Sequence, residues 1–395
     1  MILDLFAGPG GWSHALSLLG HRDIGLEWDE WACKTRAMAG QLTVRTDVSK
    51  YPVHPWVGRT RGLIASPPCQ AWSMAGKRLG RLDQPLVHEA VAALAAGRDI
   101  RAQLLPACRD PRSLLAAEPM RYLHALQGVG EPEWIAMEEV PDVLPLWRQY
   151  AAVLRGWGFS VWTGILNAAD YGVPQTRRRS ILLASRTRVA HPPEPTHAEV
   201  DEPEHLFGPG RRRWVSMAEA LGWGATDRPV PVVCAGGGPG GGPEPWPSGA
   251  RKALAGSRGR GAWAPRAAER GTWRWSLRSN SQAHASIRSL TQPAGTLFFG
   301  HRANECTWIA EPAGGESAGS FGAPPPPPIR ITSAEAGLLQ TFPADYPWSG
   351  TKGRKFSQIG NAVPPLLAVH LLAPFLTHRR YDPSATDPKT FGLAA

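Results

Sequence analysis

A lone cysteine after two prolines is the first feature of this 395-residue chain whose residue types could carry chemistry. Cys69 follows Pro67 and Pro68, which come directly after the apolar segment 62–66. A thiolate is a strong nucleophile, and the two prolines stiffen the backbone that places it. Taken alone, a single cysteine is more often a buried structural residue. The pattern therefore indicates a nucleophile only in combination with other signals.

A glycine-rich turn, residues 4–11, follows the apolar segment 2–5 and opens a predicted helix. A helix that begins there presents free N–H groups and the positive end of its dipole, and glycines let a ligand approach the backbone closely. The turn predicts a cradle for a nucleotide-like cofactor. Its spacing is shorter and richer in glycine than G-x-G-x-x-G, which argues against NAD.

Three residues extend this predicted cradle. Glu27 ends a second predicted strand, where a dinucleotide fold places an acid on ribose hydroxyls, although a solvated strand-end carboxylate is the alternative. Trp28 is placed to lie against an adenine ring, and Asp47 could accept a hydrogen bond from an adenine amino group.

An acid and two arginines could act on an electron-poor ring. Glu138 ends the predicted strand 134–138, and only one of Glu138 and Glu139 should reach a pocket because strand residues alternate between faces. Arg177 and Arg179 share one face of an extended segment, where they could bind phosphate or a carbonyl that gains charge. The alternatives are an exposed acid and a solvated basic face.

The composition limits the possible partners. A formal charge of +10, with 43 Lys and Arg, favours a polyanion, although a GC-rich genome also enriches arginine. We expect no membrane span and no signal peptide, because the chain has no run of eighteen apolar residues and starts directly with a strand. Five scattered cysteines without a CxxC pair indicate neither disulfides nor zinc, which fits a reducing cytoplasm.

These residues need a scaffold that brings them to one edge. Residues 1–185 alternate apolar strands and helical segments, as in a parallel α/β sheet. Strands are predicted at 2–5, 23–27, 62–66, 134–138 and 180–184, with helices at 10–19 and 29–38. Ligands of such sheets bind at the carboxyl ends of the strands.

The amino-acid composition changes after about residue 190. Residues 229–249 are rich in glycine and proline, and the arginines around them alternate with Trp246, Trp263, Trp273 and Trp275. We expect a loop-rich lobe with a basic, aromatic surface. Pro324 to Pro328 is interpreted as a surface spacer, and helices are predicted at 333–340 and 366–375.

In order along the chain, these motifs resemble the cytosine-5 DNA methyltransferase family. Segment 4–11 resembles its S-adenosylmethionine loop, and 66–70 its catalytic loop. Segments 138–141 and 167–179 resemble its Glu-Asn-Val strand and its arginine motif. Segments 288–297, 340–343 and 358–365 resemble its later motifs, whereas 225–280 has no counterpart, as expected for target recognition.

The resemblance implies a role for each matching residue. Cys69 would attack carbon 6 of a flipped cytosine, Glu138 would contact the ring nitrogen, and Arg177 with Arg179 would steady the base. S-adenosylmethionine would be bound, without a metal, by Asp4, Phe6, Ala7, Gly8, Gly10, Gly11, Glu27, Trp28, Asp47, Pro67, Asn361 and Val363. Double-stranded DNA would be contacted by Gln70, Ser73, Lys77, Arg78, Gln175 and Arg288.

Glu139 stands where the family usually has asparagine. We expect this acid to be tolerated, so that the Glu139→Asn variant turns over no faster than the wild type in a methyl-transfer assay. A large gain in the variant would contradict this.

The predicted fold class is thus α/β, with a mostly parallel Rossmann-like methyltransferase sheet and a smaller loop-rich target-recognition domain. The predicted boundaries are 1–190 and 330–385 for the catalytic domain, 191–329 for target recognition, and 386–395 for a tail. We expect a monomer in a bacterial or phage-infected cytoplasm, with a separate restriction endonuclease as a possible partner. A tRNA methyltransferase and a non-catalytic DNA-binding protein are the alternatives, and the target sequence cannot be derived.

Overall fold

The computed structural model of the chain describes residues 1–72, 79–203, 210–222, 273–279, 285–297, 306–312 and 328–377. It divides into two compact units. The first comprises Met1–Ala168, Arg178–Pro195 and Asn361–Pro383, and the second Ala169–Arg177, Thr196–Gly360 and Ser384–Ala395. The polypeptide therefore passes between the units five times.

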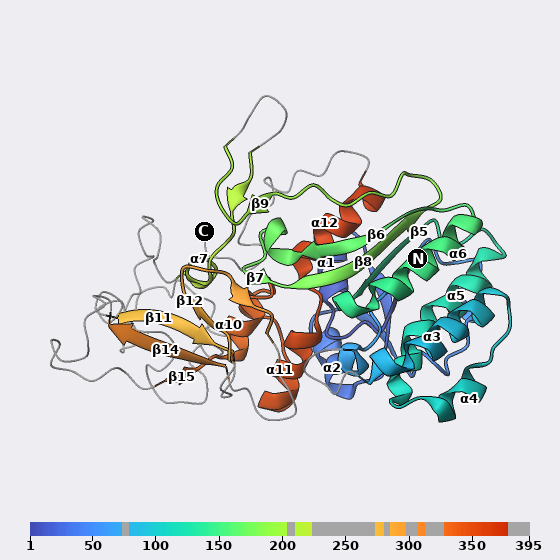
Figure 1. Cartoon of the computed structure of the whole chain (residues 1–395), viewed down its shortest axis with the longest axis horizontal. Coiled ribbons are helices and arrows are strands. Elements are labelled where there is room, and N and C mark those ends of the chain that lie inside the picture. Colours follow the sequence, from blue (N-terminus) through green and yellow to red (C-terminus); the bar gives the residue numbers. More distant parts are fainter. Residues whose placement is uncertain are drawn as a thin grey trace. The chain divides into compact units, whose positions relative to one another are not determined.

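A seven-stranded sheet forms the centre of the first unit (Figure 1). Its order is β3-β2-β1-β4-β5-β8-β6, and all pairings up to β5 are parallel, whereas β8 runs antiparallel to both of its neighbours. The mostly parallel sheet predicted from the sequence is confirmed. The strands are β1 (Ile2–Leu5), β2 (Asp23–Glu27), β3 (Leu42–Arg45), β4 (Gly62–Ala65), β5 (Trp134–Glu139), β6 (Ser160–Asn167) and β8 (Arg178–Ser185).

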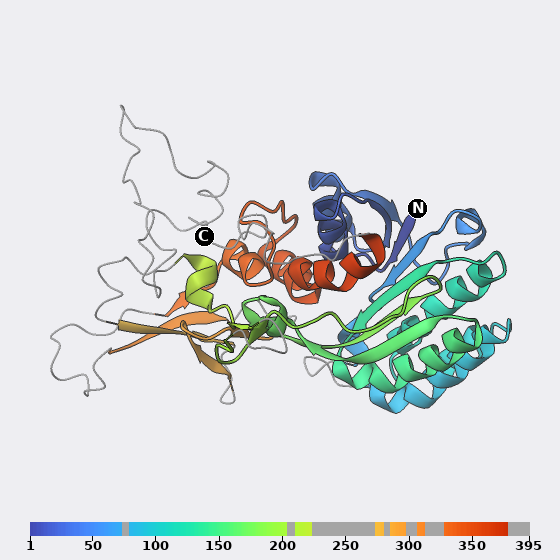
Figure 2. The same ribbon diagram turned by 90° about the horizontal axis from the view of Figure 1, so that it is seen from above.

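Helices cover both faces of this sheet (Figure 2). The cyan-to-green helices α3, α5 and α6 lie on one side, and the blue α1 and red α12 on the other. Alternate strand residues supply the two cores: Leu63 and Met137 pack in the first, while Ile64 and Ala136 face the opposite side. The helices are α1 (Gly11–Leu18), α2 (Glu30–Met38), α3 (Gly80–Ala95), α4 (Arg101–Leu104), α5 (Glu118–Gln127), α6 (Leu144–Gly156) and α12 (Pro365–Leu376).

The C-terminal helix α12 is a core element of the first unit. Trp134 of β5 stacks on Phe375, with ring centroids 5.6 Å apart and planes within 2°. The stretch Lys352–Leu376 has the length and composition of a membrane-crossing helix, with mean hydropathy 1.6, but 72% of that window is buried within the protein. Such burial is typical of a core helix.

The second unit contains a four-stranded antiparallel sheet of order β12-β11-β14-β15 and two short two-stranded pairings. Trp275 and Trp308 of this sheet are buried, so Trp275 is a core residue. Trp246, Trp263 and the side chain of Trp273 lie outside the described residues. The remaining elements are β7 (Gln175–Thr176), β9 (His197–Ala198), β10 (Arg212–Arg213), β11 (Trp273–Arg278), β12 (Ile287–Ser289), β13 (Ala294–Gly295), β14 (Thr307–Pro312), β15 (Ile329–Arg330), α7 (Met217–Leu221), α10 (Ser333–Leu338) and α11 (Lys352–Asn361).

The observed boundaries differ most from the predicted ones in two places. Residues 330–360 fall in the second unit, although the prediction placed them with the catalytic domain, and so do residues 169–177. The reason is contacts within the second unit: β15 joins the sheet of β14, α10 contacts α7, and β7 pairs with β13.

Glu335 gives the second unit a pH-dependent stability. It closes a capping box at the start of α10, where Thr332 N donates to Glu335 Oε2 at 2.7 Å. Burial raises the pKa of Glu335 from 4.5 to about 7, against the hydrogen bonds from Thr332 and Trp308. In the unfolded chain, the Glu335 carboxyl group loses its proton near pH 4.5, whereas in the folded protein it keeps the proton up to about pH 7. The stabilisation that neutral Glu335 gives to the folded state is therefore fully present below pH 4.5 and is lost as the pH rises to 7.

We expect the free energy of unfolding of the wild type, relative to that of Glu335→Gln, to fall by up to about 3 kcal/mol between pH 4.5 and pH 7. Urea unfolding of both proteins across this pH range measures the difference. Glu219→Gln is the matched control, because Glu219 closes the same kind of capping box on α7 at an exposed position. A pH-independent difference for Glu335 would contradict the prediction.

Candidate active site

The glycine turn between β1 and α1 has the backbone of a close-approach site. Gly8 and Gly10 have φ values of 54° and 98°, and Gly10 is the residue directly before α1. Phe6 also has a positive φ, 62°, which a bulky residue rarely adopts. Such strain is concentrated at functional sites, and here it lies at the predicted cofactor turn.

Glu27 fixes this turn against the end of β2. Its Oε2 accepts from Gly8 N at 2.8 Å, and its Oε1 accepts from Trp28 N at 2.8 Å and Asp29 N at 2.7 Å. Burial raises the pKa of Glu27, and these three hydrogen bonds oppose the shift. The side chain predicted to bind ribose therefore also holds the turn in place.

A buried acid lies below the turn. Asp4 on β1 is fully buried, and neither of its carboxyl oxygens has a hydrogen-bond partner within the described residues. Burial, followed by the charge of Asp23, raises the pKa of Asp4 well above its usual range. An unpartnered acceptor beneath a glycine cradle fits a ligand that carries polar donors.

Trp28 and Asp47, which are predicted to form an adenine subsite, both have solvent-accessible side chains. The side chain of Trp28 is among the most exposed large apolar groups, at 73%. Asp47 follows β3, and its Oδ1 accepts from Ser49 N at 2.9 Å and Ser49 Oγ at 2.7 Å. The Oδ2 atom lies 3.7 Å from the exposed Lys50 Nζ, so the carboxylate remains accessible.

The C-terminal part of the first unit returns to the glycine turn. A Cβ added at Gly11 would lie 2.1 Å from the carbonyl oxygen of Val363. Asn361 is exposed and Val363 buried, and both belong to the first unit. The structure thus brings Val363 against the turn.

This contact makes Gly11→Ala a sharp test. We expect the variant to lose about 1–3 kcal/mol of unfolding free energy, because a backbone carbonyl cannot move aside as a flexible side chain could. Gly156→Ala at the end of α6 is the matched control, since nothing lies within 4 Å of its added Cβ, and it should be neutral or stabilising. Chemical denaturation measures both; an unchanged Gly11→Ala protein would refute the close contact.

Cys69 sits just beyond the carboxyl end of β4. Pro67 is buried, and Cys69 begins a 3-10 helix, Cys69–Ala71, with its side chain partly exposed at the edge of the core. Trp12 of α1 donates through Nε1 to Ser66 Oγ at 2.9 Å, which ties the cysteine-bearing loop to the helix of the glycine turn. Gln70 is also partly exposed.

Glu138 and Arg179 form a buried ion pair at the same edge. Met137 is in register with Ala65 of β4, so Glu138 extends one residue past that pair at the carboxyl end of β5. Arg179 Nε lies 2.8 Å from Glu138 Oε1, and the two side chains are only 7% and 6% exposed. Such a pair positions the acid where little water can compete.

The side chains of Glu138 and Glu139 diverge, as the alternation along a strand predicts. Glu139 Oε2 accepts from Val140 N, and the Glu139 carbonyl accepts from Ser180 Oγ at 3.1 Å. The acid that replaces the expected asparagine is thus bound to its own backbone on β5.

The remaining predicted residues fall elsewhere. Arg177 belongs to the second unit, where it is buried and its Nη1 donates to Gly360 O at 2.9 Å. Gln175 is fully buried, so its predicted DNA contact has no exposed side chain in this structure. Arg288 on β12 is partly exposed. Ser73, Lys77 and Arg78 lie outside the described residues.

Sequence reasoning missed the residues that support the site. Arg36 on α2 is fully buried and donates to Ser13 Oγ at 2.8 Å, Thr43 Oγ1 at 2.8 Å and Asp23 Oδ2 at 3.3 Å. It thereby joins α1, β2 and β3 under the glycine turn. Neither Arg36 nor Trp12 stands in a recognisable motif, so only the fold identifies them. Within the described ranges, no group of three or more potential metal ligands occurs.

Comparisons with known proteins identify the family of the chain. The family model of the C-5 cytosine-specific DNA methylases matches residues 1–95, 105–206 and 268–375. The type II methyltransferase M.DdeI of Desulfomicrobium norvegicum is 26% identical over 93% of this chain and 86% of its own. M.Eco47II of Escherichia coli is 26% identical over 94% and 79%, respectively.

A solved structure shows the same fold. A protein described as a DNA modification methyltransferase, encoded within an E. coli prophage, superposes with a TM-score of 0.51 at 20% identity. The match covers 94% of this chain and 97% of that one. At this identity the likeness concerns the fold alone.

Proposed function

Because the chain belongs to the C-5 cytosine-specific DNA methylase family and is an S-adenosylmethionine-dependent DNA cytosine-5 methyltransferase, we propose that it methylates a cytosine flipped out of a specific duplex sequence. The observation that carries this proposal is the buried Glu138–Arg179 pair beside the strand that leads to Cys69. A nucleophile and an oriented acid at one sheet edge suit addition to a pyrimidine ring.

In the proposed reaction, the Cys69 sulfur forms a bond to carbon 6 of the cytosine. As the ring accepts the electron pair, its nitrogen at position 3 takes the proton of the Glu138 carboxyl group, which Arg179 keeps in place. Carbon 5 thereby becomes nucleophilic. When carbon 5 takes the methyl group, the methyl donor keeps the electron pair of the broken bond and nitrogen 3 returns its proton to Glu138. A base then removes the proton from carbon 5, the electrons re-form the double bond between carbons 5 and 6, and Cys69 leaves as a thiolate.

The proposed cofactor is S-adenosylmethionine, which supplies an electrophilic methyl group when bound. The turn of Gly8 and Gly10, the unpartnered carboxyl of Asp4 and the exposed ring of Trp28 fit such a ligand. We assign Glu27 to the ribose, Trp28 to the adenine face and Asp47 to the adenine amino group. Asn361 and Val363 complete the site from the C-terminal segment.

The proposed setting is protection of DNA in a restriction–modification system or in a phage, in the cytoplasm of the host cell. The relatives named as type II methyltransferases support a restriction–modification setting. A monomer suffices for this chemistry, and a cognate endonuclease would act separately on the same sequence.

Transfer of labelled methyl groups from S-adenosylmethionine tests the proposal. Duplex DNA of mixed sequence and tRNA are incubated in parallel, and labelled DNA is mapped by bisulfite sequencing. We expect label in DNA at one short motif. Label in tRNA alone would move the substrate to RNA. DNA binding without label, and without a covalent adduct on a 5-fluorocytosine duplex, would make the protein a non-catalytic binder.

A further inference from the structure

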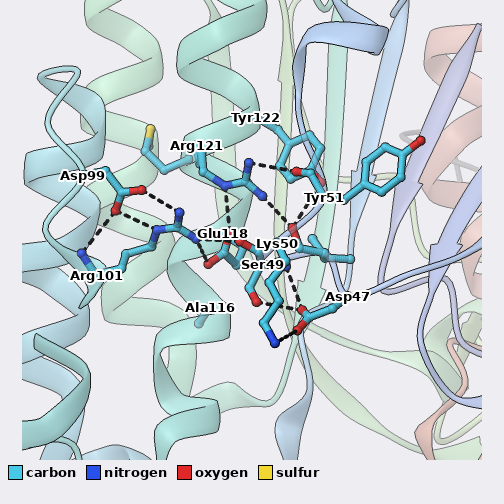
Figure 3. A network of polar contacts seen from close by, with 12 residues as sticks. Asp47, Ser49, Lys50, Tyr51, Asp99, Arg101, Ala116, Glu118, Arg121 and Tyr122 are labelled. Carbon is cyan, nitrogen blue, oxygen red and sulfur yellow. Dashed lines mark hydrogen bonds and ion pairs between the residues drawn. The ribbon is translucent and has the colours of Figure 1, made fainter. Parts of the chain in front are cut away.

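The segment 47–51, which carries Asp47, is held by side chains from two distant helices rather than by strand pairing (Figure 3). Arg121 of α5 makes two of these contacts. Its Nη2 donates to Val48 O at 2.5 Å, and its Nη1 donates to Tyr51 O at 3.1 Å. The fork of one guanidinium group thus bridges the carbonyls of Val48 and Tyr51, near the two ends of the segment.

Two further side chains bind the carbonyl groups of the same segment. Arg101 Nη1 of α4 donates to Ser49 O at 3.3 Å, and Tyr122 OH donates to Val48 O at 3.2 Å. The partners are 52 and 74 residues apart in the chain. The carbonyls of Val48, Ser49 and Tyr51 are therefore all satisfied from α4 and α5, which fixes the path of the backbone between them.

Glu118 lies between the two arginines and orients both of them, as Figure 3 shows. Its Oε2 accepts from Arg121 Nε at 3.0 Å, and its Oε1 accepts from Arg101 Nη1. The side chain of Glu118 is 3% exposed, and those of Arg101 and Arg121 are 18% and 16% exposed. Burial raises the pKa of Glu118, and the charges of the two arginines oppose this shift.

The segment 47–51, held by these side chains, in turn orients Asp47. The Oδ1 atom of Asp47 accepts from both the N–H and the hydroxyl of Ser49, whose carbonyl Arg101 holds. The position of the Asp47 carboxylate therefore depends on the path of the backbone of residues 48–51. Asp47 itself remains partly exposed, with a side-chain accessibility of 33%, whereas Glu118, Arg101 and Arg121 are 3%, 18% and 16% exposed.

We propose that Glu118, through Arg101 and Arg121, is a positioning residue that aims Asp47 at the adenine end of the cofactor. The inference rests on the proposed function, because it assigns Asp47 to S-adenosylmethionine. Glu118 and its two arginines touch no reacting atom, so they act on cofactor affinity and selectivity for the adenine amino group rather than on methyl transfer itself.

A double-mutant cycle tests this inference. S-adenosylmethionine binding to the DNA-free enzyme is measured by calorimetry for the wild type, Arg121→Lys, Asp47→Ala and the double variant. Lysine keeps a cation beside Glu118 but cannot bridge two carbonyls. We expect Arg121→Lys to raise the Kd and the KM for the cofactor about ten-fold, with kcat at saturation unchanged within about two-fold.

In the Asp47→Ala background, the same Arg121→Lys change should raise the Kd by less than about two-fold, because its effect passes through Asp47. Glu118→Gln should repeat the Arg121→Lys pattern. Arg155→Met on α6 is the matched control: its guanidinium also donates to a backbone carbonyl, Val161 O at 3.0 Å, but far along the chain from the segment. It should leave the Kd unchanged.

Equal Kd values for the wild type and Arg121→Lys, or additive effects in the double variant, would overturn the inference while leaving the proposed function intact. A wild-type enzyme that binds no S-adenosylmethionine would instead remove the proposed cofactor site and this inference with it. Thermal unfolding of each variant separates a positioning effect from loss of fold.

Discussion

Replacing Cys69 by serine should abolish methyl transfer, with a loss of at least about a thousand-fold in kcat. A serine hydroxyl is almost entirely protonated at neutral pH, so it cannot add to carbon 6 as a thiolate does. The prolines before Cys69 and the tie from Trp12 to Ser66 remain, so the loop should keep its place. Labelled methyl transfer and adduct formation on a 5-fluorocytosine duplex measure the loss.

Cys108→Ser is the control for Cys69→Ser, because Cys108 is also partly buried in the first unit and its thiol only donates to Leu104 O at 3.6 Å. It should keep nearly full activity and adduct formation. DNA binding by Cys69→Ser should persist, since the nucleophile is not needed to hold the duplex. Residual turnover of Cys69→Ser near the wild-type level would show that another group attacks the base.

Replacing Glu138 by glutamine should lower kcat by about a hundred- to ten-thousand-fold. The amide cannot transfer a proton to the ring nitrogen, and it leaves the buried guanidinium of Arg179 without its opposite charge. Removing one partner of a buried pair is also costly for folding, so unfolding should be measured together with turnover. Activity that is lost without a matching loss of fold would assign the effect to chemistry.

The control for Glu138→Gln is an ion pair directly before β4 and β5, at the end of these strands opposite to Glu138. Arg61 Nε lies 2.9 Å from Glu133 Oε2, but the two side chains are 68% and 44% exposed. Glu133→Gln should therefore change stability by less than about 1 kcal/mol and leave turnover unchanged. Similar losses of turnover for the two variants would mean that neither burial nor position at the active edge explains the Glu138 effect.

Local patterns predict the first half of the sheet well. The glycine turn requires a strand before it and a helix after it, and β1, α1 and β2 begin and end within a residue or two of the predicted bounds. The short apolar runs of β4 and β5 are buried along their whole length, and they carry Cys69 and Glu138 to one edge as expected. Here the hydrophobic pattern and the chemistry-bearing residues agree.

The strands that were missed lack that pattern. β3 is an edge strand whose outer residues are exposed, and β6 is only partly buried, so neither stands out as an apolar run. The antiparallel direction of β8 depends on its insertion between β5 and β6, a pairing that no local signal encodes. The unit boundary at 360 differs from the predicted one at 330, because β15 pairs with β14 and so belongs to the second unit.

The side-chain partners of the site show the same limit. Glu138 and Arg179 were each predicted as functional, but the antiparallel pairing of β5 with β8 is what makes them partners. Glu118, Arg101 and Arg121 belong to no motif that points to the cofactor, and their connection to segment 47–51 exists only in three dimensions. Motifs identify the groups that touch ligands, whereas the groups that aim them require the fold.

The interleaved path of the chain also sets an order for folding during synthesis. The core of the first unit needs α12, whose Phe375 stacks on Trp134 and whose Pro374 and Thr377 carbonyls accept from Arg188. A growing chain cannot close this core until the ribosome has made residue 377, long after the nucleophile and the glycine turn have emerged. Since domains fold as units, a nascent chain should acquire a complete cofactor site only as its last helix leaves the exit tunnel.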